Sequence, residues 1–319
     1  MQFNGRNKEP ILIVGEGRLC YSVTVCLAMA GYTVTLFTED KETAAKNINI
    51  HFTDLSNIAR EPVKQKNAEI TDSLENGLPY KLVVVVTGEN VLKKRKLIQK
   101  LEEKIPANSI LAINTESIPL SVLQKGSKNP ERIIGVNWSE PAHTTYFLEL
   151  IANDKSNTVM VDNLFQEAKL FWNKDPYIIF NDLGIRSKLL TALTREAFYL
   201  LENGFASIED IDRACRNDPG YYLPFAGNFR YMDLMGGPVA YGRVMKDLNP
   251  ELTKLRHIPD FFMDLIEKAE QCMENNKAIY EYKNGDTEKW DETFRKFSYE
   301  VKAVIEKYPF KYPKQNPSE

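Results

Sequence analysis

The chain has 319 residues, of which 43% are hydrophobic and 27% charged, and its formal net charge is −3 at pH 7. These proportions are typical of a globular protein, and the length favours two domains over a single hydrophobic core. The charge balance excludes the basic face of a nucleic-acid-binding protein, and no apolar run reaches the roughly 18 residues of a membrane span, so we expect neither partner.

The first half of the chain alternates short apolar runs with helical patterns. Residues 11–14 form a continuous apolar run that ends at Gly15, as expected for a strand buried on both faces, and residues 19–30 predict a helix that Gly31 ends. Further strands are predicted at residues 34–37, 82–86, 110–113, 133–136, 147–151 and 177–180, and further helices at about 90–104 and at 163–172. This alternation predicts an α/β fold with a Rossmann-type, doubly wound, mostly parallel sheet.

After about residue 182 the pattern becomes helical throughout. Residues 189–202 are apolar with helical periodicity and end at Gly204, and Ser207 followed by Asp210 predicts the cap of another helix. Helical patterns continue at residues 262–272 and 290–306. We therefore predict a Rossmann domain at residues 1–182 and an all-helical C-terminal domain at residues 183–319.

The cysteines and histidines indicate neither disulfides nor a metal site. The N-terminal segment has no apolar signal-peptide core, and the cysteines form no CxxC pair, so we expect free thiols and a cytoplasmic protein. The histidines lie far apart in the sequence, and we expect no bound metal. The cysteines are Cys20, Cys26, Cys215 and Cys272, and the histidines are His51, His143 and His257.

Gly15 and Gly17 follow the first strand and open the first helix, which is the setting of a dinucleotide fingerprint. The first glycine permits a tight turn, and the second lets the backbone approach a pyrophosphate on the helix N-terminus. The third position is Cys20 instead of Gly or Ala, and Thr38 followed by Glu39 stands where an acidic ribose ligand is expected. We predict that Gly15, Gly17 and Glu39 bind NAD; Lys41 would favour the 2′-phosphate of NADP, but no Arg accompanies it. A sheet that has lost nucleotide binding is the alternative.

Four later segments carry more specific patterns. They are residues 87–94 (TGENVLKK), 113–118 (INTESI), 130–141 (PERIIGVNWSEP) and 196–212 (EAFYLLENGFASIEDID). In that order they are similar to the segments PENxxxK, SNTSS, PxRxxGxHFFNP and EAxxLxxxGxASxEDID of the 3-hydroxyacyl-CoA dehydrogenase family. The chain therefore resembles this family over nearly its whole length.

The resemblance implies a Rossmann domain followed by a helical domain through which the enzymes form homodimers. It implies oxidation of a 3-hydroxyacyl-CoA by hydride transfer to NAD, as in fatty-acid metabolism. It also implies that Glu89, Lys94 and Asn114 belong to the cofactor site. In the family reaction a His takes the hydroxyl proton, a Glu orients that His, and a Ser and an Asn bind the substrate oxygen.

Only one of these four catalytic residues is retained. Glu149 keeps the Glu position, whereas Asn137 replaces the His, Glu116 replaces the Ser and Ser187 replaces the Asn. An Asn amide is not a base near neutral pH, and loss of a positioned base costs on the order of 10²- to 10⁴-fold in rate. The segment between Thr38 and the strand at residues 82–86 is also shorter than the family segment that helps hold CoA.

Two residues are candidates for a replacement base. Glu116 would lie near the substrate oxygen, unless it points to solvent or bonds local backbone amides, and His143 follows in the next loop, unless it is simply an exposed loop residue. We expect a divergent NAD-dependent 3-hydroxyacyl-CoA dehydrogenase-like oxidoreductase with impaired or altered catalysis. The alternatives are a non-catalytic family member that binds a dinucleotide or acyl-CoA, and a dehydrogenase of a free hydroxy acid.

Overall fold

The computed structural model describes residues 8–60, 63, 68–75, 79–267, 279–280 and 282–308. The chain divides into two compact units, Met1–Lys188 and Leu189–Glu319. The sequence-based boundary after residue 182 lies just before the helix α6 (Ile185–Glu202), whose first turn belongs to the first unit.

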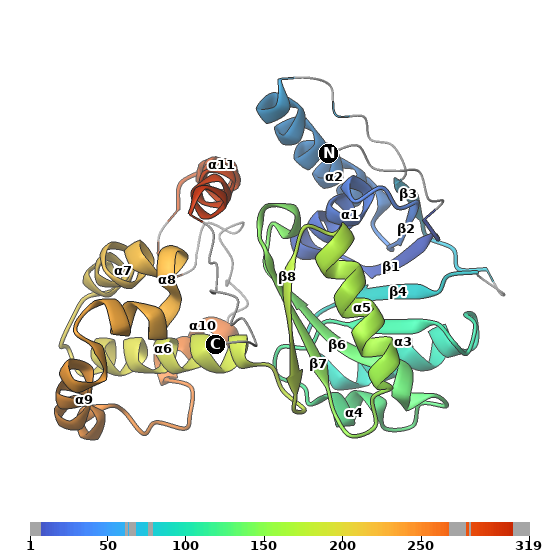
Figure 1. The fold of residues 1–319 in the computed structure, drawn as a ribbon. Helices are drawn as coiled ribbons and strands as arrows, with labels where there is room; N and C mark the ends of the chain where they lie inside the picture. Colours follow the sequence, from blue (N-terminus) through green and yellow to red (C-terminus); the bar gives the residue numbers. More distant parts are fainter. Residues whose placement is uncertain are drawn as a thin grey trace, which may run out of the picture. The chain divides into compact units, whose positions relative to one another are not determined.

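The first unit is built on an eight-stranded sheet in the order β3-β2-β1-β4-β5-β6-β7-β8 (Figure 1). Neighbouring strands are parallel except for β6 and β7, which pair antiparallel. The predicted mostly parallel sheet is therefore confirmed. The strands are β1 (Ile11–Gly15), β2 (Val34–Phe37), β3 (Ala68–Thr71), β4 (Leu82–Val86), β5 (Ile110–Ile113), β6 (Ile133–Trp138), β7 (Phe147–Ala152) and β8 (Asp175–Phe180).

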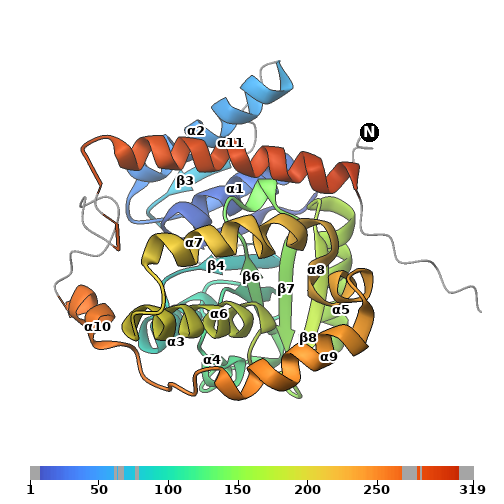
Figure 2. The same cartoon turned by 90° about the vertical axis from the view of Figure 1, so that its left-hand side faces the viewer.

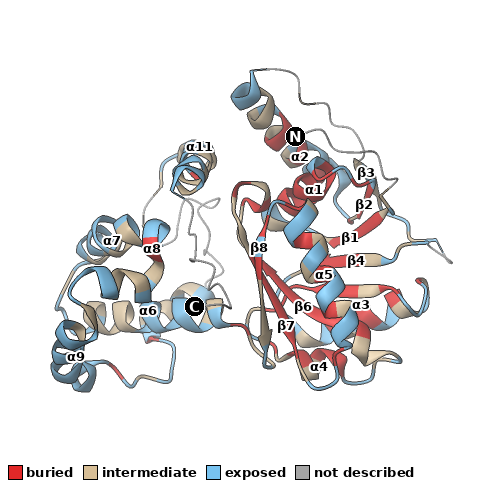
Figure 3. Ribbon diagram, in the orientation of Figure 1, coloured by how far each residue is buried: buried red, intermediate tan, exposed pale blue. Residues whose placement is uncertain are grey.

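Helices cover both faces of this sheet, which explains the unbroken apolar run of β1. Ile11 and Ile13 pack into one core with α1 (Arg18–Met29), α2 (Lys41–Ala59) and α5 (Thr158–Phe171). Leu12 and Val14 pack into a second core with α3 (Val91–Glu102) and α4 (Leu120–Gln124). The buried residues of Figure 3 concentrate in the sheet and on the helix faces toward it. Alternate side chains of one strand thus enter two different cores.

The sequence analysis missed α2 and β3 and placed some ends differently. In α2 the buried residues Ala44, Ile48 and Phe52 recur every four positions among polar ones, which is the pattern of an amphipathic helix. The polar average of the segment meant that this helix was not predicted. The helix α5 begins at Thr158, not at residue 163. The strand β6 continues to Trp138, so Asn137 lies inside it.

The described part of the second unit is helical, in agreement with the prediction. Ser207 caps α7 by accepting a hydrogen bond from the Asp210 amide at 3.2 Å, as the sequence predicted. The helix α8 packs on both α7 and α9 (Figure 2). After α6 come α7 (Ile208–Asn217), α8 (Pro219–Leu234), α9 (Gly237–Leu248), α10 (Asp260–Glu267) and α11 (Asp286–Lys307). The predicted helix at residues 262–272 lies outside the described residues beyond residue 267, as does Cys272.

Within the described residues of both units, the helices are too short or too polar to cross a membrane.

Candidate active site and nucleotide site

The turn between β1 and α1 has the geometry that its glycines predict. Gly15 and Gly17 have φ angles of 149° and 86°, which residues other than glycine rarely adopt. A Cβ at Gly15 would lie 1.8 Å from the carbonyl oxygen of Val86 on β4, whereas a Cβ at Gly17 would meet no atom within 4 Å. Gly15 is therefore required by packing, and Gly17 borders open space at the start of α1. This is the space that a pyrophosphate needs.

Two buried hydroxyls near this turn have no hydrogen-bond partner among the described residues. They belong to Thr38, which follows β2, and Thr87, which follows β4. Because β2 and β4 both pair with β1 in parallel, these hydroxyls lie at the same edge of the sheet as Gly15. Buried hydroxyls are normally bonded, so this edge is suited to a ligand that supplies the missing partners. Gly17 and the two hydroxyls fit a bound dinucleotide.

The residues after β2 are consistent with a cofactor that lacks a 2′-phosphate. Glu39 is exposed, and Thr38 is 2% exposed. Lys41, the nearest cation in the sequence, pairs with Asp72 at 2.9 Å. Cys20 in the third fingerprint position is fully buried, and this burial raises the pKa of its thiol well above the usual range.

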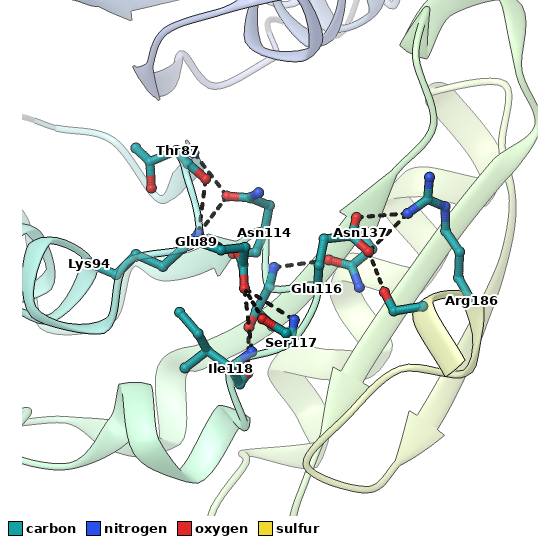
Figure 4. Close-up of polar contacts among 11 residues, drawn as sticks. Thr87, Glu89, Lys94, Asn114, Glu116, Ser117, Ile118, Asn137 and Arg186 are labelled. Atoms are coloured by element: carbon teal, nitrogen blue, oxygen red, sulfur yellow. Dashed lines mark hydrogen bonds and ion pairs between the residues drawn. The ribbon is translucent and has the colours of Figure 1, made fainter. Parts of the chain in front are cut away.

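Lys94, Asn114 and Glu89 form one cluster that ties the loops after β4 and β5 together (Figure 4). Lys94 Nζ is buried and donates to the backbone oxygen of Thr87 at 3.1 Å and to Asn114 O and Oδ1 at 2.6 and 2.9 Å. Glu89 lies 3.3 Å from Lys94 Nζ and accepts hydrogen bonds from the Ser117 amide and hydroxyl at 3.1 and 3.2 Å. These residues position the loops at the nucleotide edge, and their contact with NAD stays a prediction.

Burial and the neighbouring groups shift the pKa values of both Lys94 and Glu89. Burial lowers the pKa of Lys94, and the neighbouring carboxylate of Glu89 opposes that effect. Burial alone would raise the pKa of Glu89, but the Ser117 amide and the Lys94 charge outweigh it and hold this pKa below its usual value. Glu89 is therefore ionised near neutral pH.

Asn137 and Glu149 face each other across β6 and β7, and both are fully buried. Asn137 Oδ1 accepts from the Thr115 amide at 2.9 Å, and its Nδ2 donates to Glu149 Oε2 at 3.0 Å. The Thr115 amide can only donate, so the Asn137 oxygen must face it and the amide nitrogen must face Glu149. Asn137 is therefore a hydrogen-bond partner of Glu149 that provides no base, and its equivalence with the family's His stays a prediction.

The other oxygen of Glu149 is fully used by the start of α6. Oε1 accepts from the Ile185 amide at 2.7 Å, the Arg186 amide at 3.2 Å and the Tyr177 hydroxyl at 3.0 Å. Burial and the nearby Glu149 charge raise the pKa of Tyr177 well above its usual range. Glu149 caps the N-terminus of α6, where a negative charge is stabilised.

Glu116 pairs with side chains of α6, so the expectation that it points to solvent or bonds local amides is wrong. Arg186 Nη1 lies 2.9 Å from each carboxylate oxygen of Glu116, and the Ser187 hydroxyl donates to the same carboxylate (Figure 4). The Arg186 and Glu116 side chains are 30% and 31% exposed. Arg186 and Ser187 therefore fix the position of the Glu116 carboxylate.

The sequence analysis did not single out Arg186. A signal was present, because Arg186 directly precedes the changed position Ser187, and Glu116 introduces the opposite charge at another changed position. Two changes of opposite charge near one site are expected to pair.

His143 is not an exposed loop residue, as one interpretation had it. It lies in the short turn η2 (Ala142–Thr144), is half-buried, and its ring packs edge-to-face on that of His51 on α2, with centroids 4.8 Å apart. The Ala142 amide beside it donates to the Ser22 hydroxyl on α1 at 3.0 Å. The structure therefore gives His143 a packing role between η2 and α2. In the described part of the chain, no group of three or more His, Cys, Asp or Glu side chains is arranged to hold a metal.

Comparison with known proteins assigns both halves of the chain. Residues 10–183 match the model of the 3-hydroxyacyl-CoA dehydrogenase NAD-binding domain, and residues 185–282 match that of the C-terminal domain of the same enzymes. The peroxisomal fatty acid beta-oxidation multifunctional protein MFP2 of Arabidopsis thaliana is 26% identical, over 94% of this chain and 42% of that protein. This chain thus spans less than half of that multifunctional relative.

A shorter relative matches over most of both chains. The 5-formyl-3-hydroxy-2-methylpyridine 4-carboxylate 5-dehydrogenase of Mesorhizobium japonicum is 24% identical, over 85% of this chain and 90% of that protein. The crystal structure of a dehydrogenase of this name, described as an NAD⁺-dependent dismutase, superimposes with a TM-score of 0.83 at 22% identity, over 95% of this chain and 99% of that one. This likeness shows the fold. The two domain matches show that the chain belongs to the NAD-dependent 3-hydroxyacyl-CoA dehydrogenase family.

Proposed function

We propose that this protein is a divergent oxidoreductase that transfers a hydride between NAD and a 3-hydroxyacyl thioester or related 3-hydroxy acid, with catalysis impaired relative to the family. The observation that carries this proposal is the buried Asn137–Glu149 pair. It keeps the position and the partner of the family's base without a group that can take the hydroxyl proton.

The nucleotide side of the site supports retained NAD binding. Gly17 and the first turn of α1 would hold the pyrophosphate, Thr38 and Glu39 lie where the adenosine ribose is expected, and the Thr87 hydroxyl lacks a partner among the described residues. When bound, NAD supplies the acceptor for a hydride from the carbinol carbon. The residues of this chain then contribute mainly positioning, which can accelerate hydride transfer without a base.

Two alternatives keep specific support. A non-catalytic binding role is favoured by the saturation of Glu149, whose two oxygens accept four hydrogen bonds within the first unit. A free hydroxy acid as substrate is favoured by the cation of Arg186 in the catalytic centre and by the relative whose name includes a 4-carboxylate.

The test is a rate measurement with repair of the site. Oxidation of NADH with acetoacetyl-CoA is followed at saturating cofactor for the wild type, for Asn137→His, and for the triple variant Asn137→His/Glu116→Ser/Ser187→Asn. We expect the wild type to run on the order of 10²- to 10⁴-fold below the triple variant. Wild-type turnover that equals the triple variant and survives Glu116→Gln and His143→Ala would refute the proposal. A wild type that binds NADH, together with a triple variant that binds acetoacetyl-CoA and still shows no turnover, would favour the non-catalytic role.

We also propose that the protein is a cytoplasmic homodimer formed through the C-terminal domain, residues 183–319. The support is the exposed apolar surface of α8 and α9, where Tyr221 is 83%, Phe229 79% and Val239 70% exposed. Exposed apolar surface of this extent is typical of interaction sites. Sedimentation analysis of the wild type and of Phe229→Glu tests this, with a dimer and a monomer as the respective expected results.

A further inference from the structure

The Arg186–Glu116 pair lies at the ligand-binding edge of the sheet. Glu116 follows β5, and β5 is parallel to β4 and β6, so Glu116 shares an edge with Thr87 after β4 and with Asn137 near the end of β6. Ligands of open α/β sheets bind at this carboxyl edge. With about a third of each side chain exposed, the pair is accessible to a ligand.

Arg186 is placed rigidly, but its donors are only partly used. Its backbone amide donates a hydrogen bond to Glu149 Oε1 at 3.2 Å, and its guanidinium carbon lies 5.7 Å from the centre of the Phe147 ring. Only Nη1 reaches Glu116, and Figure 4 shows the other guanidinium nitrogens turned away from that carboxylate. Within the described residues, Nε and Nη2 have no hydrogen-bond partner. A guanidinium with two unused donors on one edge fits a carboxylate.

We infer that Arg186 is the anchor for a substrate carboxylate, so that the protein takes a small oxo or hydroxy acid with a free carboxylate instead of a CoA thioester. This rests on the proposed function and on the family resemblance, by which positions 116 and 187 bind the substrate oxygen. A neutral thioester carbonyl needs only the neutral donors that the family uses there. A cation at this position gains its full interaction only with an anionic group.

In this proposal Glu116 competes with the substrate carboxylate for the guanidinium of Arg186. Its carboxylate occupies Nη1 of the same guanidinium and repels a second carboxylate, while the Ser187 hydroxyl holds it in place. Removal of its charge should therefore strengthen carboxylate binding. A merely structural ion pair predicts no such gain, because a ligand would then have no use for Arg186.

The experiment measures binding, not turnover. The full-length protein is titrated calorimetrically, with and without saturating NADH, with acetoacetate, malonate and the neutral acetoacetate analogue acetylacetone. The variants are Arg186→Gln, Arg186→Lys and Glu116→Gln. Arg213→Gln serves as the matched control, because Arg213 also pairs with a carboxylate at 3.0 Å, that of Asp210. Thermal melting confirms that each variant is folded.

We expect at least one of the two carboxylates to bind the wild type and the Arg213→Gln control equally. Arg186→Gln should weaken that binding by about tenfold or more, and Arg186→Lys by less. Glu116→Gln should tighten it by about tenfold, and acetylacetone should bind weakly and equally to all variants. Equal affinity for wild type and Arg186→Gln, or no carboxylate binding at on the order of 10 mM, would overturn the inference. The proposed function would survive that result if the repaired triple variant reduced acetoacetyl-CoA.

Discussion

Reversal of the hydrogen-bond polarity between Asn137 and Glu149 gives the sharpest test of the candidate active site. In the structure the Thr115 amide donates to Asn137, and Asn137 donates to Glu149. The double variant Asn137→Asp/Glu149→Gln keeps every donor facing an acceptor. The new carboxylate at position 137 would accept from the Thr115 amide and from the new side-chain amide at position 149. The remaining side-chain oxygen at position 149 would still accept from α6 and Tyr177.

Each single substitution breaks this order in a different way. Glu149→Gln places an amide donor against the Asn137 amide donor, and it removes a buried charge that accepts four hydrogen bonds. Asn137→Asp places two buried carboxylates at a separation of about 3 Å, the present distance of their facing atoms. We expect each single variant to lose about 2–5 kcal/mol of unfolding free energy. The double variant should recover about 2 kcal/mol or more relative to the sum of the singles.

The assay must report on the first unit alone. Trp138 and Trp172 are buried and stacked there, with ring centroids 5.6 Å apart, and Trp290 is the third tryptophan of the chain. Urea unfolding is therefore followed by fluorescence in a Trp290→Phe background, with all four members of the cycle in parallel. Additive single and double effects would refute the assigned orientation of Asn137 and its direct bond to Glu149.

Three further predictions concern the nucleotide edge. Gly15→Ala should lower the free energy of unfolding by more than about 3 kcal/mol, because its Cβ would overlap the Val86 carbonyl. Gly17→Ala should lower it by only about 1–2 kcal/mol, measured by thermal melting. The same Gly17→Ala variant should lose NADH binding in a fluorescence titration. Thr38→Val should leave the melting temperature unchanged, because its hydroxyl has no partner to lose among the described residues, and should weaken NADH binding about three- to tenfold; unchanged affinity would contradict a role for this hydroxyl. The pKa of Glu89 is lower in the folded than in the unfolded chain, so its contribution to stability is present above about pH 4.5 and is lost as the pH falls through the folded pKa. Glu89→Gln should therefore lose less unfolding free energy than the wild type as the pH is lowered. An unchanged slope of unfolding free energy against pH would refute this linkage.

The fold could be predicted where local pattern and tertiary burial coincide. The apolar run at Ile11–Gly15 is buried on both faces because helices cover both sides of the sheet, so its composition alone indicates a central parallel strand. The edge strand Ala68–Thr71 carries no such signal, since it pairs only with β2 and is only partly buried. The helix Lys41–Ala59 was missed because its buried apolar residues, one in four, stand among many polar ones.

The candidate active site depends on contacts that no local sequence pattern contains. Asn137 and Glu149 face each other only because β6 and β7 pair antiparallel in one register. Arg186 and Glu116 meet across 70 positions of the chain. The sequence could therefore name Asn137, Glu116 and Ser187 as changed positions, but it could not show that two of them bond each other and that Arg186 joins them.

These contacts bear on how the centre diverged. Loss of catalysis by drift alone would leave buried polar atoms of the old site without partners, at a cost of about 1–3 kcal/mol each. Every carboxylate and amide heteroatom of Asn137, Glu149 and Glu116 instead has a partner, and the charge introduced at Glu116 is balanced by Arg186. At the nucleotide edge, by contrast, the hydroxyls of Thr38 and Thr87 lack partners in the described part of the chain, and a ligand can supply them. The Asn137–Glu149 network is thus complete, whereas Nε and Nη2 of Arg186 and the two threonine hydroxyls have no partner among the described residues. These unused groups are what a new substrate and NAD would need, and they favour altered over abandoned chemistry.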